Sequence, residues 1–370
     1  MNIGAVILAA GYSSRMGGFK PLMQLGGMSL LCHCAERFKA AGITDITVVT
    51  GHRREAVEAE STRLNVKTVH NPDYDHGMLS SVCSAVHHLH HLDGFFLLPV
   101  DIPLVYPATL TRLIRSFDGH SVRIPIFCGE EGHPPLIPTS IIPAILEHGS
   151  RGSQGGLRAV LAVHPGLTVP VWDRGVLMDG DTPEDFAALQ HRFAGISIGE
   201  PEEAMALAGL LMPEKGITHG LAAAKIARQL GEKLNASGYT LNLNLLHNAA
   251  LLHDVGKGFP DHEAKGAMIL AELGLHGLTD IVAAHRSVPP PADGRLTEKE
   301  IVCLADKLVR GCRRVSIHER FSEKLDRYSD DPQACMAIRR RLTEVLAIKT
   351  LVEQQTGCSL SDSIAEGVRP

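Results

Sequence analysis

The chain has 370 residues, which is more than one hydrophobic core usually organises, so we expect two domains. Hydrophobic residues make up 44% and charged residues 21%, as in a soluble globular protein, and this composition excludes an intrinsically disordered chain. The formal net charge of -5 argues against a broad basic face for nucleic acid, and no run approaches the roughly 20 apolar residues that span a bilayer. Eight cysteines without paired spacings, and an opening segment without a signal peptide, indicate a reduced, cytoplasmic protein. We therefore expect neither nucleic acid nor a membrane among its partners.

The first half of the chain alternates short apolar runs with amphipathic ones. The runs predicted as buried strands, rich in apolar or β-branched residues, are 3–10, 43–50, 66–69 and 95–100. The helical patterns between them are 29–41, 53–64 and 79–92. This alternation predicts a Rossmann-like α/β domain whose mostly parallel sheet is covered on both faces and binds ligands at the carboxyl ends of its strands. Two further runs, 122–127 and 135–138, predict a hairpin, and Thr182 caps a helix that begins at Pro183 and closes the domain near residue 193.

The pattern changes at about residue 201, where strand-like runs end and Leu, Ala and charged residues recur at helical spacing. We expect this half to be all α. Its predicted helices are 202–211, 218–235, 243–254, 262–273, 298–309 and 331–355. The resulting division is a first domain at 1–193, a linker with a leading helix at 194–214, and a second domain at 215–360.

Residues 8–20, which read LAAGYSSRMGGFK, follow the first predicted strand. A bound triphosphate needs backbone N–H groups and cations to offset its charge, presented by a sharply turning chain. Gly11 and Gly17 allow sharp turns of the backbone, and the small Ala9 and Ala10 leave room for a base. Arg15 and Lys20 are cations that can bind the phosphates. The segment is not a Walker loop, because no Gly-Lys-Ser/Thr follows, and it lacks the dinucleotide-binding fingerprint. It predicts a different kind of nucleoside triphosphate loop.

A motif of the form Leu-Ala-Ala-Gly-x-Ser-x-Arg-Met-Gly followed by a lysine matches residues 8–17 and Lys20. Over about residues 1–193 the chain resembles the nucleotidylyltransferases that attach a nucleotide to molybdopterin, and specifically their cytidylyltransferase branch. The guanylyltransferase branch carries Ala-Gly-Gly where this chain has Ala9-Ala10-Gly11, so the resemblance favours CTP. Further segments that match the family are Asn71-Pro72, Gly77-Met78, Ser80-Ser81, Gly132-His133-Pro134 and Asp181 to Asp185.

The resemblance implies transfer of a nucleoside monophosphate from the triphosphate to a phosphorylated acceptor, with release of pyrophosphate. Asp101 occupies the family's magnesium position, and Asp181, or else Asp179, would be the second Mg²⁺ ligand. Arg15, Lys20 and Asp101 would act by positioning and charge neutralisation. The nucleotide-binding residues implied in the same way are Leu8, Ala9, Ala10, Gly11, Ser13, Gly17, Ser80 and Ser81.

Molybdopterin is the acceptor that the resemblance implies, but two departures leave other acceptors open. The family usually has Gly-Asp-Gln-Pro where this chain reads Val100-Asp101-Ile102-Pro103, and it usually has an aspartate in the loop that corresponds to residues 152–156. Sugar- and alditol-phosphate nucleotidylyltransferases share the glycine-rich opening. A sugar or alditol phosphate is therefore the alternative acceptor.

A second set of candidate ligands, His219, His253, Asp254 and Asp306, comes from three predicted helices of the second half. A metal that activates water for phosphate ester hydrolysis needs nitrogen and carboxylate ligands on rigid elements, with an open position for the water. The order of these residues resembles the HD family of metal-dependent phosphohydrolases over about residues 215–320. The resemblance implies a hydrolytic metal site in the second domain.

His262 and His285 fall where HD members with two metals place further histidines. One or two ions of iron or manganese would suit this His-carboxylate set, and Lys257 would steady a phosphate oxygen. A close likeness within the family is the branch that hydrolyses dinucleoside polyphosphates. The alternative is a sensor or docking module that binds a nucleotide, or a client molybdoenzyme, without hydrolysing anything.

Overall fold

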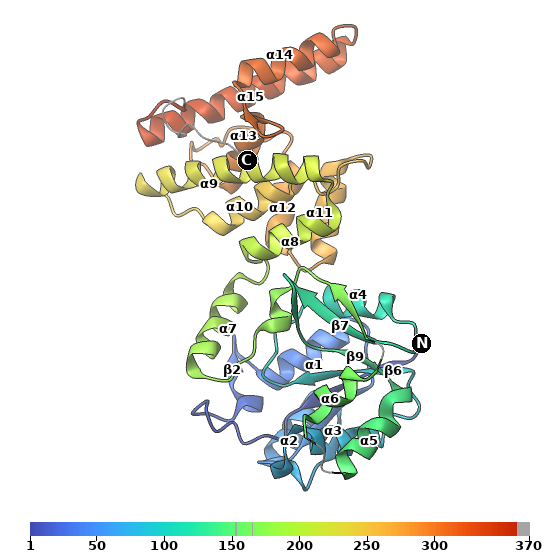
Figure 1. Cartoon of the computed structure of the whole chain (residues 1–370). Coiled ribbons are helices and arrows are strands. Elements are labelled where there is room, and N and C mark those ends of the chain that lie inside the picture. The colour runs from blue at the N-terminus through green and yellow to red at the C-terminus, as the bar shows by residue number, and fades with distance from the viewer. Residues whose placement is uncertain (152–153, 165, 361–370) are drawn as a thin grey trace. The chain divides into compact units, whose positions relative to one another are not determined.

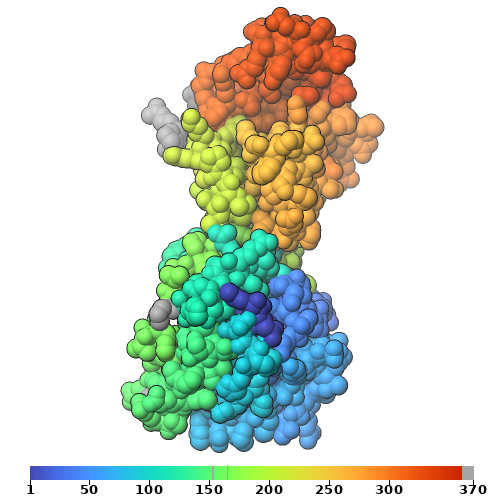
Figure 2. Space-filling view, turned by 90° about the vertical axis from the view of Figure 1, so that its right-hand side faces the viewer, coloured from blue at the N-terminus to red at the C-terminus, as the bar shows by residue number. Residues whose placement is uncertain are grey.

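The computed structural model describes residues 1–151, 154–164 and 166–360. The chain forms two compact units, Met1–Ala194 and Gly195–Pro370, and the colours in Figure 2 show that each is made of one continuous stretch of sequence. Among the described residues, no helix is long and apolar enough to cross a membrane.

The first unit is built on an eight-stranded, mostly parallel sheet (Figure 1). Its strands are β1 (Ile3–Leu8), β4 (Ile46–Thr50), β5 (Lys67–His70), β6 (Gly94–Pro99), β7 (Val122–Phe127), β8 (Glu130–Glu131), β9 (Leu136–Pro138) and β10 (Gly166–Pro170). They run in the order β10-β7-β9-β6-β1-β4-β5, with β8 paired to β7. β1 is parallel to both β4 and β6, and Leu8 stands opposite Val49 and Pro99. The loops that follow these three strands therefore start from one edge of the sheet.

Helices cover both faces of this sheet (Figure 1). They are α1 (Leu30–Ala40), α2 (Arg54–Arg63), α3 (Met78–Val86), α4 (Pro107–Ser116), α5 (Ile142–Ser150), α6 (Gly156–Ala162) and α7 (Pro183–Gly195). Val6 and Leu8 of β1 share a buried core with α3, α5 and α6. Ala5 and Ile7 alternate with them and are also buried, so both faces of the strand are covered. A small ribbon of β2 (Gln24–Leu25) and β3 (Met28–Ser29) precedes α1.

The second unit is mainly helical. Its helices are α8 (Pro201–Leu211), α9 (Glu214–Ala236), α10 (Leu243–Leu252), α11 (His262–Glu272), α12 (His276–Ala284), α13 (Glu298–Lys307), α14 (Ile317–Arg327) and α15 (Pro332–Thr356). α10 packs against α8, α9, α12 and α13. Ala249 to Leu252 are fully buried, as expected for a central helix that is apolar on all sides. The end of α10 is therefore held rigidly by its neighbours.

The predicted fold class is confirmed: a mostly parallel α/β sheet is followed by a helical region. The two runs of the predicted hairpin, β7 and β9, are antiparallel neighbours in the sheet, but the short strand β8 comes between them in the chain and also pairs with β7 through a tight turn. Cys128 and Gly129 both have positive φ in that turn, as two-residue hairpin loops require. The second unit also departs from all α through a small hairpin, β11 (Val309–Arg310) with β12 (Arg313–Arg314).

Candidate active sites

The first candidate site lies where the chain leaves the carboxyl end of β1. The amide of Ala9 still donates to the carbonyl of Val49 at 3.0 Å, and beyond it Gly11 has open space on its side-chain side. The amide of Lys20 donates to Ser13 Oγ at 3.1 Å, which brings the end of the loop back to its start. The loop forms one wall of a pocket of about 280 Å³.

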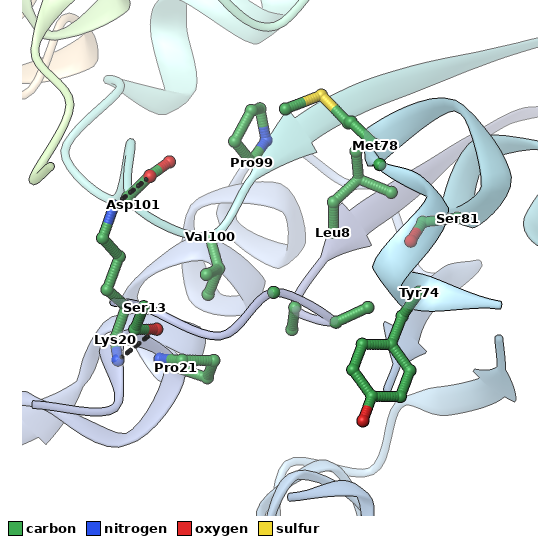
Figure 3. A pocket seen from close by; sticks show the side chains of 14 residues that line it. Leu8, Ser13, Lys20, Pro21, Tyr74, Met78, Ser81, Pro99, Val100 and Asp101 are labelled. Carbon is green, nitrogen blue, oxygen red and sulfur yellow. Dashed lines mark hydrogen bonds and ion pairs between the residues drawn. The ribbon is translucent and has the colours of Figure 1, made fainter. Parts of the chain in front are cut away.

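This pocket has a charged end and an apolar end. Figure 3 shows Lys20 and Asp101 at one end and Tyr74 and Ser81 at the other, with Leu8 between them. Of the residues predicted to bind nucleotide, those that line the pocket are Leu8, Ala9, Ala10, Gly11, Ser13 and Ser81. Gly17 and Ser80 are not among its lining residues.

Lys20 joins two carboxylates at the charged end. Its Nζ lies 2.8 Å from Asp101 Oδ2 and 2.5 Å from Asp181 Oδ1. The other oxygen of Asp181 accepts from the Arg15 guanidinium at 2.6 Å. The amide of Gly180 donates to the Asp101 carbonyl at 2.9 Å, so the two carboxylate-bearing loops are tied together beside the pocket. The structure thus brings together four residues from three segments that lie far apart in the sequence: Arg15 and Lys20, Asp101, and Asp181.

The electrostatics of this end follow from these pairs. Burial opposes the charge on Lys20, but its hydrogen bonds to Asp101 and Asp181 outweigh burial and raise the pKa of Lys20. The hydrogen bond from Lys20 lowers the pKa of Asp181. Burial, and then repulsion from Asp181 and Asp101, raises the pKa of Asp179. Asp181 is therefore a better candidate than Asp179 for the second carboxylate ligand of a divalent cation.

The other segments that matched the motif surround this pocket or support it. The buried side chain of Asn71 donates to Ser80 Oγ at 2.8 Å and to Ser81 Oγ at 3.0 Å, which fixes the start of α3. The amide of His133 donates to the Val176 carbonyl at 2.8 Å, and burial lowers the pKa of His133. Thr182 Oγ1 accepts from the amide of Asp185 at 3.2 Å, which confirms the predicted cap of α7. Residues 152 and 153 of the predicted acceptor loop lie outside the described residues.

The second candidate site lies at the end of α10 in the second unit. His253 and Asp254 directly follow this helix, His219 comes from α9, and Asp306 comes from α13. His219 Nε2 lies 3.0 Å from Asp306 Oδ1, and His253 Nε2 lies 3.6 Å from the same oxygen. Next to His219, a Cβ on Gly220 would stand 2.2 Å from the Leu251 carbonyl oxygen. The absence of a side chain at Gly220 therefore lets α9 approach α10 closely.

The candidate ligands form two groups that share one carboxylate. The first group is His219, His253 and Asp254, and the second is Asp254, His262 and His285, with ligand atoms in each group within 4.8 Å of one another. Asp254 Oδ1 lies 3.8 Å from His262 Nε2 and 3.9 Å from His285 Nε2. The structure therefore brings all six predicted HD ligands together, with Asp254 between the groups.

Two of the histidines are oriented as metal ligands usually are. His253 Nδ1 lies 2.7 Å from the Ala250 carbonyl, and His285 Nδ1 lies 2.7 Å from the Val282 carbonyl. A carbonyl only accepts, so each Nδ1 carries the proton and each Nε2 presents its lone pair to the cluster. Burial lowers the pKa of both histidines, that of His285 to about 4. This donor set fits one or two transition-metal ions.

Cations surround the carboxylates of the cluster. Lys257 Nζ lies 2.5 Å from Asp254 Oδ2, and Lys307 Nζ lies 2.6 Å from Asp306 Oδ2. Arg320 lies 3.5 Å from Asp306 Oδ1. The sequence analysis missed Lys307 and Arg320, and it missed Tyr74 in the first site. Tyr74 lies between the matched segments 71–72 and 77–78, and Lys307 adjoins a predicted ligand, so position in the chain was the available signal for these two residues.

Comparison with known proteins places the two units in two families. The molybdenum cofactor cytidylyltransferase of Escherichia coli is 29% identical over 195 residues, a match that spans 52% of this chain and 98% of that protein. A protein of Synechococcus elongatus named "Probable molybdenum cofactor guanylyltransferase" is 31% identical over 198 residues, spanning 51% of this chain and 99% of that protein. The family model described as "MobA-like NTP transferase domain" matches residues 5–168 of this chain. The chain belongs to the MobA-like NTP transferase family.

The MobA-like part is joined to a second family. The HD domain model matches residues 216–311, which include every predicted ligand of the second site. A solved nucleotidyl transferase from Methanothermobacter thermautotroptrophicus is 24% identical, spans 52% of this chain and 98% of its own, and has a TM-score of 0.47. The chain is thus an enzyme: a nucleotidyltransferase of the MobA type that also carries an HD domain.

Proposed function

We propose that the first unit transfers CMP from CTP to a phosphorylated acceptor, most closely molybdopterin, and that the HD domain hydrolyses a phosphoester or phosphoanhydride. The observation that carries the transferase proposal is the convergence of Lys20, Asp101 and Asp181 beside an open glycine loop. The preference for CTP is supported by Ala9-Ala10-Gly11 and by the cytidylyltransferase relative.

In this reaction an oxygen of the acceptor phosphate attacks the α-phosphorus of the nucleotide. The bond from that phosphorus to the bridging oxygen breaks, and pyrophosphate leaves with the electron pair. Lys20 and Arg15 would exchange their carboxylate contacts for phosphate oxygens, and the loop from Gly11 would present backbone N–H groups. Asp101 and Asp181 would hold Mg²⁺, which offsets the charge of the triphosphate.

A second, wider pocket provides room for the acceptor. It has a volume of about 1080 Å³ and shares Gly77 and Met78 with the nucleotide pocket. Arg158, His76 and His87 line it, together with apolar side chains from α3, α5 and α6. This mixture suits a ring system that carries a phosphate, and a sugar phosphate is the alternative occupant.

The HD proposal is supported by the ligand geometry and by an excess of positive charge. Ions of iron or manganese on the two ligand groups would lower the pKa of a water molecule and so supply the nucleophile for hydrolysis. Arg320 Nε is buried and has no hydrogen-bond partner among the described residues. Burial, and then repulsion from Lys307 and Arg320, lowers the pKa of Lys324 to about 8. This concentration of positively charged side chains favours the binding of an anionic substrate.

The transferase proposal is tested by offering the purified protein each nucleoside triphosphate with Mg²⁺ and either molybdopterin or a hexose phosphate. Pyrophosphate release and the mass of the adduct identify the nucleotide and the acceptor. We expect Lys20→Met to lower transfer by about 100- to 1000-fold, because one preorganised cation is lost. Lys39→Met is the matched control, since Lys39 forms a surface pair with Glu36 and a contact with the Leu64 carbonyl, away from the pocket.

Two results would contradict the transferase proposal. One is the absence of any adduct with every triphosphate and both acceptors. The other is an unchanged transfer rate in Lys20→Met, which would show that the paired charges at this end of the pocket take no part in the reaction.

A further inference from the structure

Three rings from separate segments gather beside the nucleotide pocket, and one of them, Tyr74, lines it. The Tyr12 ring lies with its centroid 5.3 Å from that of Tyr74 and 5.0 Å from that of His52. The centroids of His52 and Tyr74 are 6.4 Å apart. Tyr12 is 53% exposed, whereas Tyr74 is half-buried and packs with one side against the core that Val6 and Leu8 share with α3. Exposed aromatic side chains that converge at a pocket are candidates for contact with a ligand.

Tyr74 is held against the pocket by the local backbone. A Cβ on Gly51 would stand 2.7 Å from Tyr74 and 2.8 Å from the Cβ of Ala10, so only glycine leaves room for this contact. Tyr74 lines the same pocket as Lys20 and Asp101, at the opposite end (Figure 3). A nucleotide whose phosphates meet Lys20 would therefore extend its base toward Tyr74.

We infer that the ring of Tyr74 stacks on the base of the bound nucleoside triphosphate, with Tyr12 beside it. This inference rests on the proposed function, in which the pocket holds the triphosphate. Every base has a π face, so Tyr74 contributes affinity for any nucleotide and does not itself choose between CTP and GTP.

The acceptor also carries a planar ring if it is a pterin, but the geometry favours the base. Tyr74 is not among the lining residues of the wider pocket, although Asp73, His76 and Gly77 around it are. Tyr74 instead lines the smaller pocket, which contains the phosphate-binding cation. The acceptor's ring is therefore an alternative that the experiment must separate.

The test compares two ligands that differ in whether they contain a base. Dissociation constants are measured in the presence of Mg²⁺ for CTP and for inorganic tripolyphosphate, with wild type, Tyr74→Leu and Tyr74→Phe. Leucine keeps apolar bulk against Ala10 but removes the π face, whereas phenylalanine retains it. We expect Tyr74→Leu to weaken CTP binding by about 5- to 100-fold and to leave tripolyphosphate binding unchanged. Tyr74→Phe should restore CTP binding to within about threefold of wild type.

Tyr328→Leu is the matched control, because it makes the same change of side chain at an exposed tyrosine of the helical unit. Unchanged CTP binding in Tyr74→Leu would overturn the inference and leave the proposed function standing. Equal loss of CTP and tripolyphosphate would also overturn it, since it would show that Tyr74 only shapes the loop. So would a raised KM for the acceptor with normal CTP binding. A wild-type protein that binds no nucleoside triphosphate would refute the proposed function itself, and the inference with it.

Discussion

The charged side chains of the transferase pocket lie on loops, whereas the ligands of the HD cluster lie on helices or directly after them. The side chain of Arg15 is 70% exposed and that of Asp181 is 32% exposed. In the HD cluster, the side chain of His253 is 1% exposed and that of Asp254 is 7% exposed. The carboxylates of both sites are paired with cations, but the first site is in part exposed, while the histidines and carboxylates of the second are mostly buried and their donor atoms already converge.

This difference predicts how each site responds to its ligand. In the transferase pocket, phosphate oxygens must replace carboxylates around Lys20 and Arg15, so substitutions there should act on substrate binding and transfer. In the HD cluster the backbone carbonyls of Ala250 and Val282 already orient two histidines. Substitutions there should act first on the retention of metal.

The largest effect is expected at the carboxylate that both HD ligand groups share. Asp254→Asn should reduce the metal content from about two ions per chain to nearly none and lower phosphohydrolase activity by at least about 100-fold. His262→Ala should remove only the ion of the second group, because the first group does not contain His262. Elemental analysis of the purified proteins measures both outcomes.

The exposed His276 provides the control, since His276→Ala should keep its metal. Nucleotide transfer by Asp254→Asn should equal that of wild type. Wild-type metal content in Asp254→Asn would show that this carboxylate holds no ion. Retained metal together with absent hydrolysis in the wild type would favour the sensor or docking alternative for the HD domain.

A buried ion pair in the first unit provides a reference for residues that stabilise the fold without lining the nucleotide pocket. Asp173 Oδ1 lies 2.8 Å from Arg192, and Asp173 Oδ2 accepts from the Tyr106 amide at 2.7 Å. Asp173→Asn leaves a buried guanidinium without its counter-charge, so we expect about 3 to 5 kcal/mol lower free energy of unfolding. Chemical denaturation measures this change.

Glu58→Gln removes an exposed helical pair with Arg54 and should cost no more than about 0.5 kcal/mol. Lys20→Met should fall between this control and Asp173→Asn, because the Lys20 side chain is 10% exposed but its partners Asp101 and Asp181 reach solvent. If it were instead as unstable as Asp173→Asn, the network around Lys20 would be structural, and the contrast between the two sites would fail.

The smallest effect concerns a buried histidine that has no place in either site. His33 is 2% exposed, its Nε2 donates to the Leu25 carbonyl at 2.7 Å, and burial lowers its pKa. Below the unfolded pKa of about 6.5 the unfolded chain binds more protons than the folded one, so stability falls as the pH falls. The thermal midpoint of the wild type should therefore fall between about pH 7.5 and about pH 5.5. In His33→Gln this fall should be smaller by on the order of 2 °C.

A chelator distinguishes this histidine from those of the HD cluster. The effect of His33→Gln should be the same with and without the chelator, because His33 binds a carbonyl and not a metal. If the chelator abolished the difference in pH dependence between wild type and His33→Gln, the pKa of His33 would depend on a bound metal. That result would contradict burial as the cause of its lowered pKa.

Much of the fold could be predicted from the sequence because buried strands carry a strong signal. The runs that became β1, β4 and β6 are mostly apolar or β-branched, as strands covered on both faces require, while the edge strand β5 was recognised from Val66, Thr68 and Val69 although none of its residues is fully buried. The edge strand β10 was missed because only Val169 in it is buried, so it lacks a hydrophobic pattern. The helices α12 and α14 were missed because short amphipathic segments near prolines and charge runs resemble loops. The secondary structure of β10, α12 and α14 therefore depends on tertiary packing more than on the local sequence.

The candidate sites could be predicted as lists of residues but not as contacts. The spacing of the motifs pointed to Lys20, Asp101 and Asp181, yet only the fold shows that Lys20 lies between the two carboxylates. Likewise the sequence pointed to six HD ligands without showing that Asp254 lies between two groups. Tyr74 had no chemical signal of its own, because its place depends on the missing side chain at Gly51.

The close approach of α9 to α10 at Gly220 has a consequence for the tolerance of the HD cluster to change. A single methyl group at this position would act as a wedge between two backbones, since it would meet the Leu251 carbonyl carbon at 3.1 Å as well as its oxygen. The wedge would displace His219 from His253 although every ligand remained in the chain. The arrangement of these ligands can thus be lost through a residue that has no functional group at all.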